Sequence, residues 1–298
     1  MATLLGGNRV LHTHAGPRRK VWEIRPQADT LGLGGSVSPI TVQRLSMDSS
    51  WWLSMGGVRL LVDPWLVGPE VDYFRWFNTQ WHATPPVPPD AVPEWDAVLI
   101  TQKYPDHLHP QTLTALNPQQ VWATEPCVPA LKRILPQAEV RVLSASEPTL
   151  RHGGLTVHRL PTRNRIDPIY EAVVLDDGAH SLWFAPHSLD LDAEHRAQLT
   201  DVSPCAALIS SFRAYRLPSL LGGTVSPGLA GLKPLVEAAE PTWIIPTHDE
   251  PKTGTGLVPW LARITPFAPE QADALPWLKG RFRPLDDYAA HDLLGSPG

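Results

Sequence analysis

Histidine and carboxylate side chains follow three apolar segments of the sequence, each at the point where the segment ends. Asp106 and His107, with His109 close behind, come after the segment 97–101; His187 follows 181–185, and His248 follows 242–246. Loops at the ends of buried strands can bring residues that are distant in sequence to one point. Neutral imidazole combined with carboxylate is the ligand set that suits zinc, iron or manganese. The recurring pattern therefore predicts a site for a divalent metal ion.

Other polar residues do not share this recurring pattern. A single histidine in a loop is more often a hydrogen-bonding residue than a metal ligand, and we interpret eight in that way: His12, His14, His82, His152, His158, His180, His195 and His291. Four loop arginines could bind a phosphate or carboxylate, although solvated surface residues are the favoured interpretation: Arg163, Arg165, Arg213 and Arg216. The aromatic stretch 65–81 could wall an apolar pocket or simply pack.

The elements that must position these residues can be inferred from the hydrophobic pattern. Two hairpins are indicated, one around Gly56-Gly57 and one around Asp176-Asp177-Gly178. Further strands are expected at 40–45, 97–101, 121–124, 140–143, 155–160, 206–210 and 242–246, and helices at 110–116, 129–135, 189–199 and 227–239. The tail after 265 should form short helices and coil. Strand-rich halves that are each followed by helices fit two packed sheets with helices outside.

Composition excludes several classes of protein. Hydrophobic residues make up 43% and charged residues 18%, which is typical of a globular chain, and the net charge of −5 gives no basic face for nucleic acid. Two cysteines, Cys127 and Cys205, are too few and too far apart for a disulfide framework or a thiolate zinc site. No apolar run is long enough to span a membrane, and no signal peptide is visible. We expect a cytoplasmic protein that acts on a small molecule.

Three of these segments together resemble the metallo-β-lactamase superfamily, in particular its lactonase-like and phosphodiesterase-like branch. They are Val-Arg-Leu-Leu-Val-Asp-Pro at 58–64, the segment 98–107, and Ile-Pro-Thr-His at 245–248. The resemblance runs from about residue 40 to 257 and implies an α/β fold, a four-layer αββα sandwich of two mixed sheets with metals at one edge. It also implies a lead-in segment at 1–36, a domain at 37–265 and a C-terminal extension at 266–298, packed on the domain or trailing from it.

The chain departs from the superfamily's HxHxDH signature at its first half. Gln102 and Tyr104 stand where the two leading histidines of the first metal site would be. Asp106 and His107 keep the second half, and His248 matches the final histidine, which also serves the second site. The resemblance therefore implies that the first site is not built and that one ion is bound.

Two further positions differ from the superfamily. His187, within Pro-His-Ser, stands where the bridging aspartate would be, and Arg163 lies near the place of an intermediate histidine. His187 is either a fourth ligand or an acid/base. A subset of plant and bacterial relatives with Gln first and Asp-His-x-His last is also similar to this loop. Asp63 resembles the strand-end aspartate beside the superfamily's metals, in a structural or orienting role.

The resulting hypothesis is a metal-dependent hydrolase of an ester, lactone or phosphoester. One divalent ion, zinc first and iron or manganese as alternatives, would be held by Asp106, His107, His187 and His248. Such an ion lowers the pKa of a bound water and supplies a hydroxide nucleophile. Catalytic roles are expected for Asp106 and His107, and for Tyr104 and His109 as acids; Gln102, Tyr104, Asp190 and Asp249 could orient the imidazoles. The alternatives are a degenerate metal- or ligand-binding protein and a mononuclear-iron redox protein.

Overall fold

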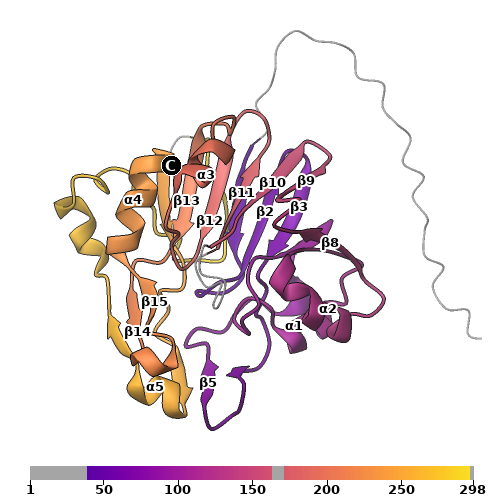
Figure 1. Cartoon of the computed structure of the whole chain (residues 1–298), viewed down its shortest axis with the longest axis vertical. Helices are drawn as coiled ribbons and strands as arrows, with labels where there is room; N and C mark the ends of the chain where they lie inside the picture. Colours follow the sequence, from indigo (N-terminus) through magenta and orange to yellow (C-terminus); the bar gives the residue numbers. More distant parts are fainter. Residues whose placement is uncertain (1–38, 163–170, 296–298) are drawn as a thin grey trace, which may run out of the picture. The chain divides into compact units, whose positions relative to one another are not determined.

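Two β-sheets dominate the computed structural model, which describes residues 39–162 and 171–295 (Figure 1). The first has seven strands in the order β19-β1-β2-β3-β6-β7-β8. Their bounds are β1 Thr41–Arg44, β2 Trp51–Met55, β3 Val58–Val62, β6 Ala97–Ile100, β7 Gln120–Thr124, β8 Glu139–Leu143 and β19 Ala290–Asp292. Strands β3, β6, β7 and β8 run parallel, and the remaining pairs are antiparallel.

The second sheet has six strands in the order β16-β13-β12-β11-β10-β9. They are β9 Thr149–His152, β10 Leu155–Leu160, β11 Ala172–Asp176, β12 Ser181–Ala185, β13 Cys205–Ser210 and β16 Trp243–Pro246. Strands β12, β13 and β16 are parallel, and the others pair antiparallel. Each sheet is therefore mixed. Within its parallel part the carboxyl ends of the strands lie along one edge.

The main core lies between the two sheets, where apolar side chains of both interdigitate, among them Leu53, Leu99, Val173 and Ile209. Helices α1 (Pro110–Leu116) and α2 (Val128–Ile134) pack on the outer face of the first sheet. Helix α4 (Leu229–Ala239) covers the outer face of the second, and α3 (Ala193–Gln198) follows β12. The predicted α/β sandwich of two mixed sheets with helices outside is confirmed.

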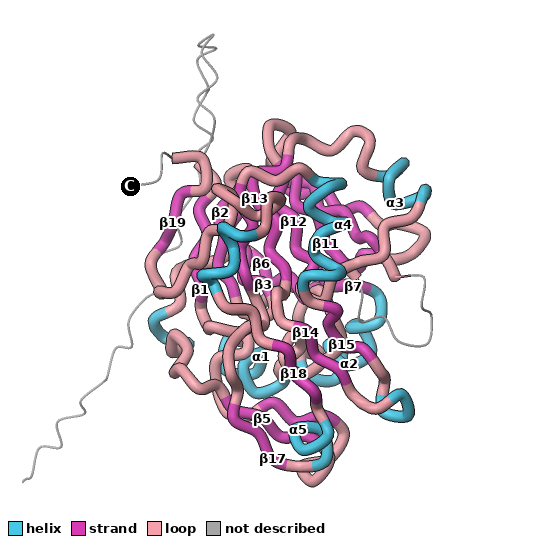
Figure 2. The backbone as a smooth tube through the Cα atoms, turned by 90° about the vertical axis from the view of Figure 1, so that its left-hand side faces the viewer, coloured by secondary structure: helices cyan, strands magenta, loops and turns pink. Residues whose placement is uncertain are grey.

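Two three-stranded sheets, visible in Figure 2, were not predicted from the sequence. One contains β4 (Glu70–Asp72), β5 (Asn78–Trp81) and β17 (Thr253–Thr255); the other contains β14 (Ala214–Arg216), β15 (Thr224–Pro227) and β18 (Arg263–Thr265). Helix α5 (Leu257–Leu261) joins β17 to β18 along the chain, and four 3-10 helices complete the structure: η1 Pro89–Ala91, η2 Glu125–Cys127, η3 Ser219–Leu221 and η4 Pro269–Ala274. Strands of three or four residues are too short to show periodicity.

Most predicted elements occur within two residues of their expected bounds. The helix expected at 189–199 begins only at Ala193, because the Asp192 side chain caps it by accepting from the His195 backbone N–H. Beyond residue 265 the chain adds β19 to the first sheet and buries Leu278, Leu285 and Leu293 in the cores. The expected lead-in at 1–36 lies outside the described residues. No described helix is long and apolar enough to cross a membrane.

Candidate metal centre

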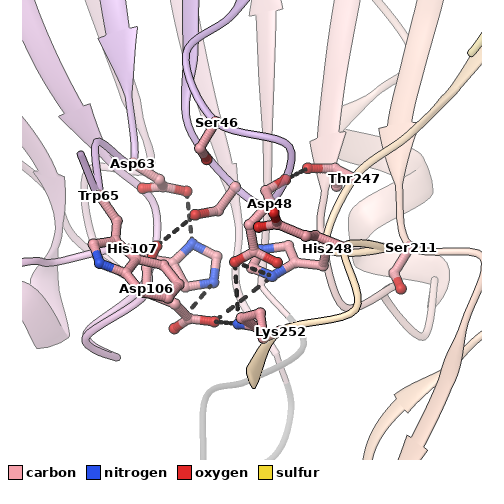
Figure 3. Close-up of polar contacts among 12 residues, drawn as sticks. Ser46, Asp48, Asp63, Trp65, Asp106, His107, Ser211, Thr247, His248 and Lys252 are labelled. Carbon is pink, nitrogen blue, oxygen red and sulfur yellow. Dashed lines mark hydrogen bonds and ion pairs between the residues drawn. The ribbon is translucent and has the colours of Figure 1, made fainter. Parts of the chain in front are cut away.

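Four side chains predicted as metal ligands lie together at the carboxyl ends of the parallel strands. Figure 3 shows three of them, Asp106, His107 and His248. Asp106 and His107 come from the loop after β6, His187 from the loop after β12 and His248 from the loop after β16. One ligand atom from each lies within 4.8 Å of the others. The widest ligand pair around an ion with bonds near 2 Å is separated by about 4 Å. Shifts of less than about 1 Å would therefore close the cluster around one ion.

The three imidazoles are arranged as a nearly regular triangle. Their ring centroids are 5.4 Å apart for His107 and His187 and 4.8 Å apart for each of these and His248. The Nε2 atoms of His107 and His187 are separated by 3.3 Å. Two nitrogens bound tetrahedrally to zinc at about 2.0–2.1 Å would also be about 3.3 Å apart. The donor set and its spacing fit a divalent ion.

A buried carboxylate fixes the orientation of His107. Nδ1–H of His107 donates to Oδ2 of Asp63 over 2.7 Å, and the backbone N–H and hydroxyl of Thr101 also donate to this carboxylate. Because Nδ1 donates to Asp63, it is Nε2 that faces the cluster, as carboxylate–histidine–metal arrangements require. Asp63 has a φ of +46°, a left-handed conformation that aspartate tolerates better than most residues. The orienting role expected for Asp63 is consistent with this geometry.

The loop 46–50 between β1 and β2 is hydrogen-bonded to two of the loops that carry the ligands. Its Ser49 hydroxyl donates to the Asp106 carbonyl oxygen over 2.6 Å, and its Asp48 carbonyl oxygen accepts the His248 backbone N–H over 3.0 Å. Oδ2 of Asp48 lies 3.5 Å from Nδ1 of His248. Nε2 of His248 and Nδ1 of His187 are buried without a hydrogen-bond partner in the described part of the chain. The nitrogens that face the other ligand groups are the remaining one of each ring: Nε2 of His187, 3.3 Å from Nε2 of His107, and Nδ1 of His248, 3.6 Å from Oδ2 of Asp106.

Two ligand loops also hold strained backbone. His248 has a φ of +56° and Ser188, next to His187, a φ of +74°. Left-handed conformations cost free energy for residues other than glycine and persist where the surrounding structure enforces them, often at functional sites.

Burial and mutual repulsion set the protonation of the imidazoles. Burial lowers the pKa of His187 to about 3, with a further contribution from His107, and burial with His187 lowers the pKa of His248 well below its usual range. Burial also opposes the charge of His107, but Asp106 and Asp63 outweigh it and raise its pKa to about 9. His187 and His248 are therefore neutral at pH 7, the form in which imidazole binds metals.

Lys252 is a member of the cluster that sequence analysis missed. Its Nζ lies 3.1 Å from Oδ2 of Asp48, 3.6 Å from Oε1 of Glu70 and 3.9 Å from Oδ2 of Asp106. Burial opposes its charge, but these three carboxylates outweigh that effect and raise the pKa of Lys252 above its ordinary value. Nothing in the local sequence around positions 48, 70 and 252 signals this arrangement, because the three residues come from separate loops and strands.

A pocket of about 360 Å³ opens over the cluster between the two small sheets. Asp106, His187 and His248 line it together with Tyr104. Its apolar lining comes from aromatic and aliphatic residues of the small sheets and their loops, among them Tyr73, Phe77, Tyr215, Leu217, Val258 and Ile264. A small molecule with an apolar body could place a polar group against the cluster.

The structure gives His109 a role different from the expected one. Its Nδ1 accepts the Thr112 backbone N–H over 3.2 Å, which caps α1, and its Nε2 lies 3.2 Å from the Pro69 carbonyl oxygen. Both ring nitrogens therefore have structural contacts, one with the start of a helix and one with a loop, and these contacts account for His109 without a role as a catalytic acid. The spacing of His109 from His107 is the same as in a ligand motif, but at the start of α1 the His109 ring is not directed at the metal cluster.

Among residues 39–162 and 171–295, no hydrogen bond joins Asp190, Asp249 or Gln102 to the imidazoles of the cluster. Asp190 is exposed, and Asp249 accepts backbone N–H groups of Phe212 and Arg213. Gln102 is buried, and neither of its amide atoms has a partner in the described structure. The Arg213 guanidinium donates to the backbone carbonyls of Asp249 and Glu250, so it connects its own loop to the loop after β16. Arg216 is exposed, and Arg163 and Arg165 lie outside the described residues.

The sequence over residues 46–203, more than half of the chain, matches a Beta-lactamase superfamily domain. The chain belongs to the metallo-β-lactamase superfamily. No curated protein matches the sequence. The predicted superfamily assignment is therefore confirmed, although the chain has diverged far in sequence.

Solved structures of this superfamily share the fold. An isothiocyanate hydrolase from Delia radicum gut bacteria superposes with a TM-score of 0.63 at 15% identity, covering 84% of this chain and 98% of its own. A possible metal-dependent hydrolase from Veillonella parvula superposes with a TM-score of 0.59 at 14% identity, and the match covers 86% of this chain and 100% of that one. A metallo hydrolase from Ignicoccus hospitalis superposes with a TM-score of 0.57 at 12% identity, and the match covers 85% of this chain and 98% of that one. At such low identity these likenesses show the fold alone.

Proposed function

We propose that this metallo-β-lactamase-superfamily protein is a metal-dependent hydrolase that binds one divalent ion through Asp106, His107, His187 and His248. The observation that carries the proposal is the convergence of these four ligand groups within 4.8 Å beside the pocket. One carboxylate and three imidazoles suit zinc first, with iron or manganese as alternatives. When bound, the ion polarises a carbonyl or phosphoryl group and activates water for attack.

The chain's own residues bind and orient the substrate. The apolar lining of the pocket would hold the body of an ester, lactone or phosphoester, and the cluster would face its reacting group. The Tyr104 hydroxyl is the candidate acid for the leaving oxygen, because Tyr104 lines the pocket beside Asp106. His187 serves as a ligand in this proposal, since the 3.3 Å spacing between its Nε2 and that of His107 matches two ligands of one ion.

The first experiment is elemental analysis of the protein purified without chelator or added metal. We expect one divalent ion per chain in the wild type and none in Asp106→Ala, which removes the carboxylate ligand and its charge. Gln102→Ala is the matched control within the same loop and should still bind one ion. Two ions in the wild type would contradict the ligand assignment, and no ion would contradict the metal proposal.

The second experiment measures turnover of lactones, thioesters, phosphodiesters and isothiocyanates with zinc, iron(II) and manganese. Isothiocyanates belong in the panel because one structurally similar protein is an isothiocyanate hydrolase. We expect metal-dependent hydrolysis by the wild type that falls at least about 100-fold in His248→Ala. Equal rates for the wild type and the variant across the panel would favour a protein that binds metal or ligand without turnover.

A further inference from the structure

The ammonium group of Lys252 is held in a built cation site beside the metal cluster (Figure 3). Asp48 is completely buried, the Glu70 side chain is 4% exposed, and the Lys252 side chain is 15% exposed. The face of the buried Trp65 ring lies 5.1 Å from Nζ of Lys252, a distance at which an aromatic face attracts a cation. Three carboxylates and an aromatic ring thus converge on one positive charge.

This site is continuous with the cluster through a shared carboxylate. Oδ2 of Asp106 lies 3.6 Å from Nδ1 of His248 and 3.9 Å from Nζ of Lys252. Asp48 makes the same connection, because its Oδ2 lies 3.5 Å from Nδ1 of His248 and 3.1 Å from Nζ of Lys252. The ammonium therefore lies on the side of Asp106 where a neighbouring ion would share that carboxylate.

We propose that Lys252 is the second cation of this centre: its ammonium takes the place beside Asp106 that another metal ion would need, and it thereby sets the stoichiometry at one ion per chain. The inference rests on the proposed metal binding. In this role Lys252 is a positioning residue, since it acts through the carboxylate of Asp106.

The charge of the ammonium supports this assignment. Lys252 already places one positive charge between Asp48, Glu70 and Asp106 in a buried region. A divalent ion bound beside that ammonium would bring two cations within a few ångströms of each other in a low-dielectric environment, which is unfavourable.

The vacated position would be a good metal site once the lysine is removed. Carboxylate oxygens from three residues are the hard ligands that manganese and magnesium prefer. Oδ1 of Asp48 is buried with no hydrogen-bond partner among the described residues, so it is free to turn toward an ion. A divalent ion in the space left by the ammonium would also restore the lost positive charge.

The test compares manganese binding by the full-length wild type and Lys252→Ala, using elemental analysis and calorimetric titration with manganese alone. We expect the stoichiometry to rise from one ion per chain to two. The electron paramagnetic resonance signal of the variant should broaden, because two manganese ions would lie within a few ångströms of each other. One ion in Lys252→Ala, bound as tightly as in the wild type, would overturn the proposal.

Three further proteins make the result specific. Lys252→Arg keeps the positive charge and should bind one ion, as should Lys233→Ala, which removes an exposed lysine of α4. The double variant Lys252→Ala with Asp48→Asn should return to one ion, because the vacated site loses a carboxylate. Two ions in Lys252→Arg would overturn the proposal.

Manganese binding by the wild type also tests the proposal, and this test does not depend on whether Lys252→Ala folds. Saturation of the wild type at one manganese ion, up to millimolar manganese, is expected from a site already filled by the ammonium. A second ion bound to the wild type at micromolar concentration would overturn the role of Lys252 while leaving metal binding intact. No ion in any of the proteins would overturn the proposed function and this inference together.

Discussion

Changing Asp63 to Asn tests whether the buried carboxylate holds His107 ready for metal binding. Asp63 accepts three hydrogen bonds, from Nδ1 of His107 over 2.7 Å and from the N–H and hydroxyl of Thr101. Asparagine keeps the shape and tolerates the left-handed backbone, where φ is +46°. Its NH₂ group must, however, face one of three donors. The variant therefore isolates the loss of the carboxylate from a change in backbone conformation.

The size of the effect follows from the tautomer. Without a carboxylate at Nδ1, His107 loses the charge-assisted bond that directs Nε2 at the cluster and fixes the ring. Removing such a partner typically weakens metal binding by about 10–100-fold, which corresponds to about 1.4–2.7 kcal/mol. We expect an effect toward the upper end, because both His107 and Asp63 are buried and no water can replace the carboxylate.

The assay is a competition titration with a chromophoric chelator, run alongside thermal unfolding of the metal-free protein. Asp96→Asn is the matched control, because it makes the same change at a carboxylate that pairs with Arg59 at the protein surface. Its metal affinity should equal that of the wild type. A folded Asp63→Asn protein whose dissociation constant stays within twofold of the wild type would refute the orienting role.

Two further predictions concern stability. Burial opposes the charge of His107, but Asp106 and Asp63 raise its pKa from 6.5 to about 9, so the folded metal-free protein holds a proton that the unfolded chain releases. The proton's contribution to the free energy of unfolding is complete below pH 6.5 and is lost as the pH rises through 9. Urea unfolding at pH 7 and at pH 9.5 should therefore differ by as much as about 3 kcal/mol. Separately, Glu171→Ala should lower the free energy of unfolding by about 1.5–3 kcal/mol, because it removes the carboxylate that binds the buried Arg159 guanidinium at 2.6 Å and leaves only Glu125, at 3.6 Å, and the Leu143 carbonyl oxygen beside it.

Both stability predictions have an internal check. Stability of the metal-free protein that stays level or rises between pH 7 and 9.5 would contradict the protonated state of His107. For the ion pair, Glu94→Ala is the control, since Glu94 binds Arg59 with a side chain that is 89% exposed. Glu94→Ala should lower the free energy of unfolding by less than about 1 kcal/mol. Equal losses for the two glutamate variants would show that burial does not govern the cost.

The sequence was informative where a local pattern reports a three-dimensional fact. Apolar runs at 58–62, 97–100 and 243–246, bounded by proline or polar residues, indicate buried strands, and polar residues directly after such strands lie at a sheet edge. This is why Asp106, His187 and His248 could be grouped although about 140 residues separate the first from the last. The likeness to a known superfamily then indicated which edge of the sheets carries the site.

The parts of the fold and the site that could not be predicted depend on long-range contacts, which leave no pattern in the local sequence. Asp48 and Lys252 are single polar residues in loops, and only the packing of the two sheets brings them within 3.1 Å. The small sheets that frame the pocket have strands of three or four residues, too short for any periodicity. His109 illustrates the opposite case: its spacing is that of a ligand, yet one ring nitrogen caps α1 and the other lies against the Pro69 carbonyl oxygen.

The last described strand has a consequence for proteolysis and solubility. Strand β19 pairs with β1 through the partners Thr41 with Asp292 and Gln43 with Ala290. It therefore covers the edge of the seven-stranded sheet with a strand only three residues long, a common protection against edge-to-edge association. A protease cut before Asp286 would uncover the hydrogen-bonding groups of β1 and remove Leu293 from the core. The trimmed protein would not be a smaller soluble domain but a chain whose open edge pairs with its own copies.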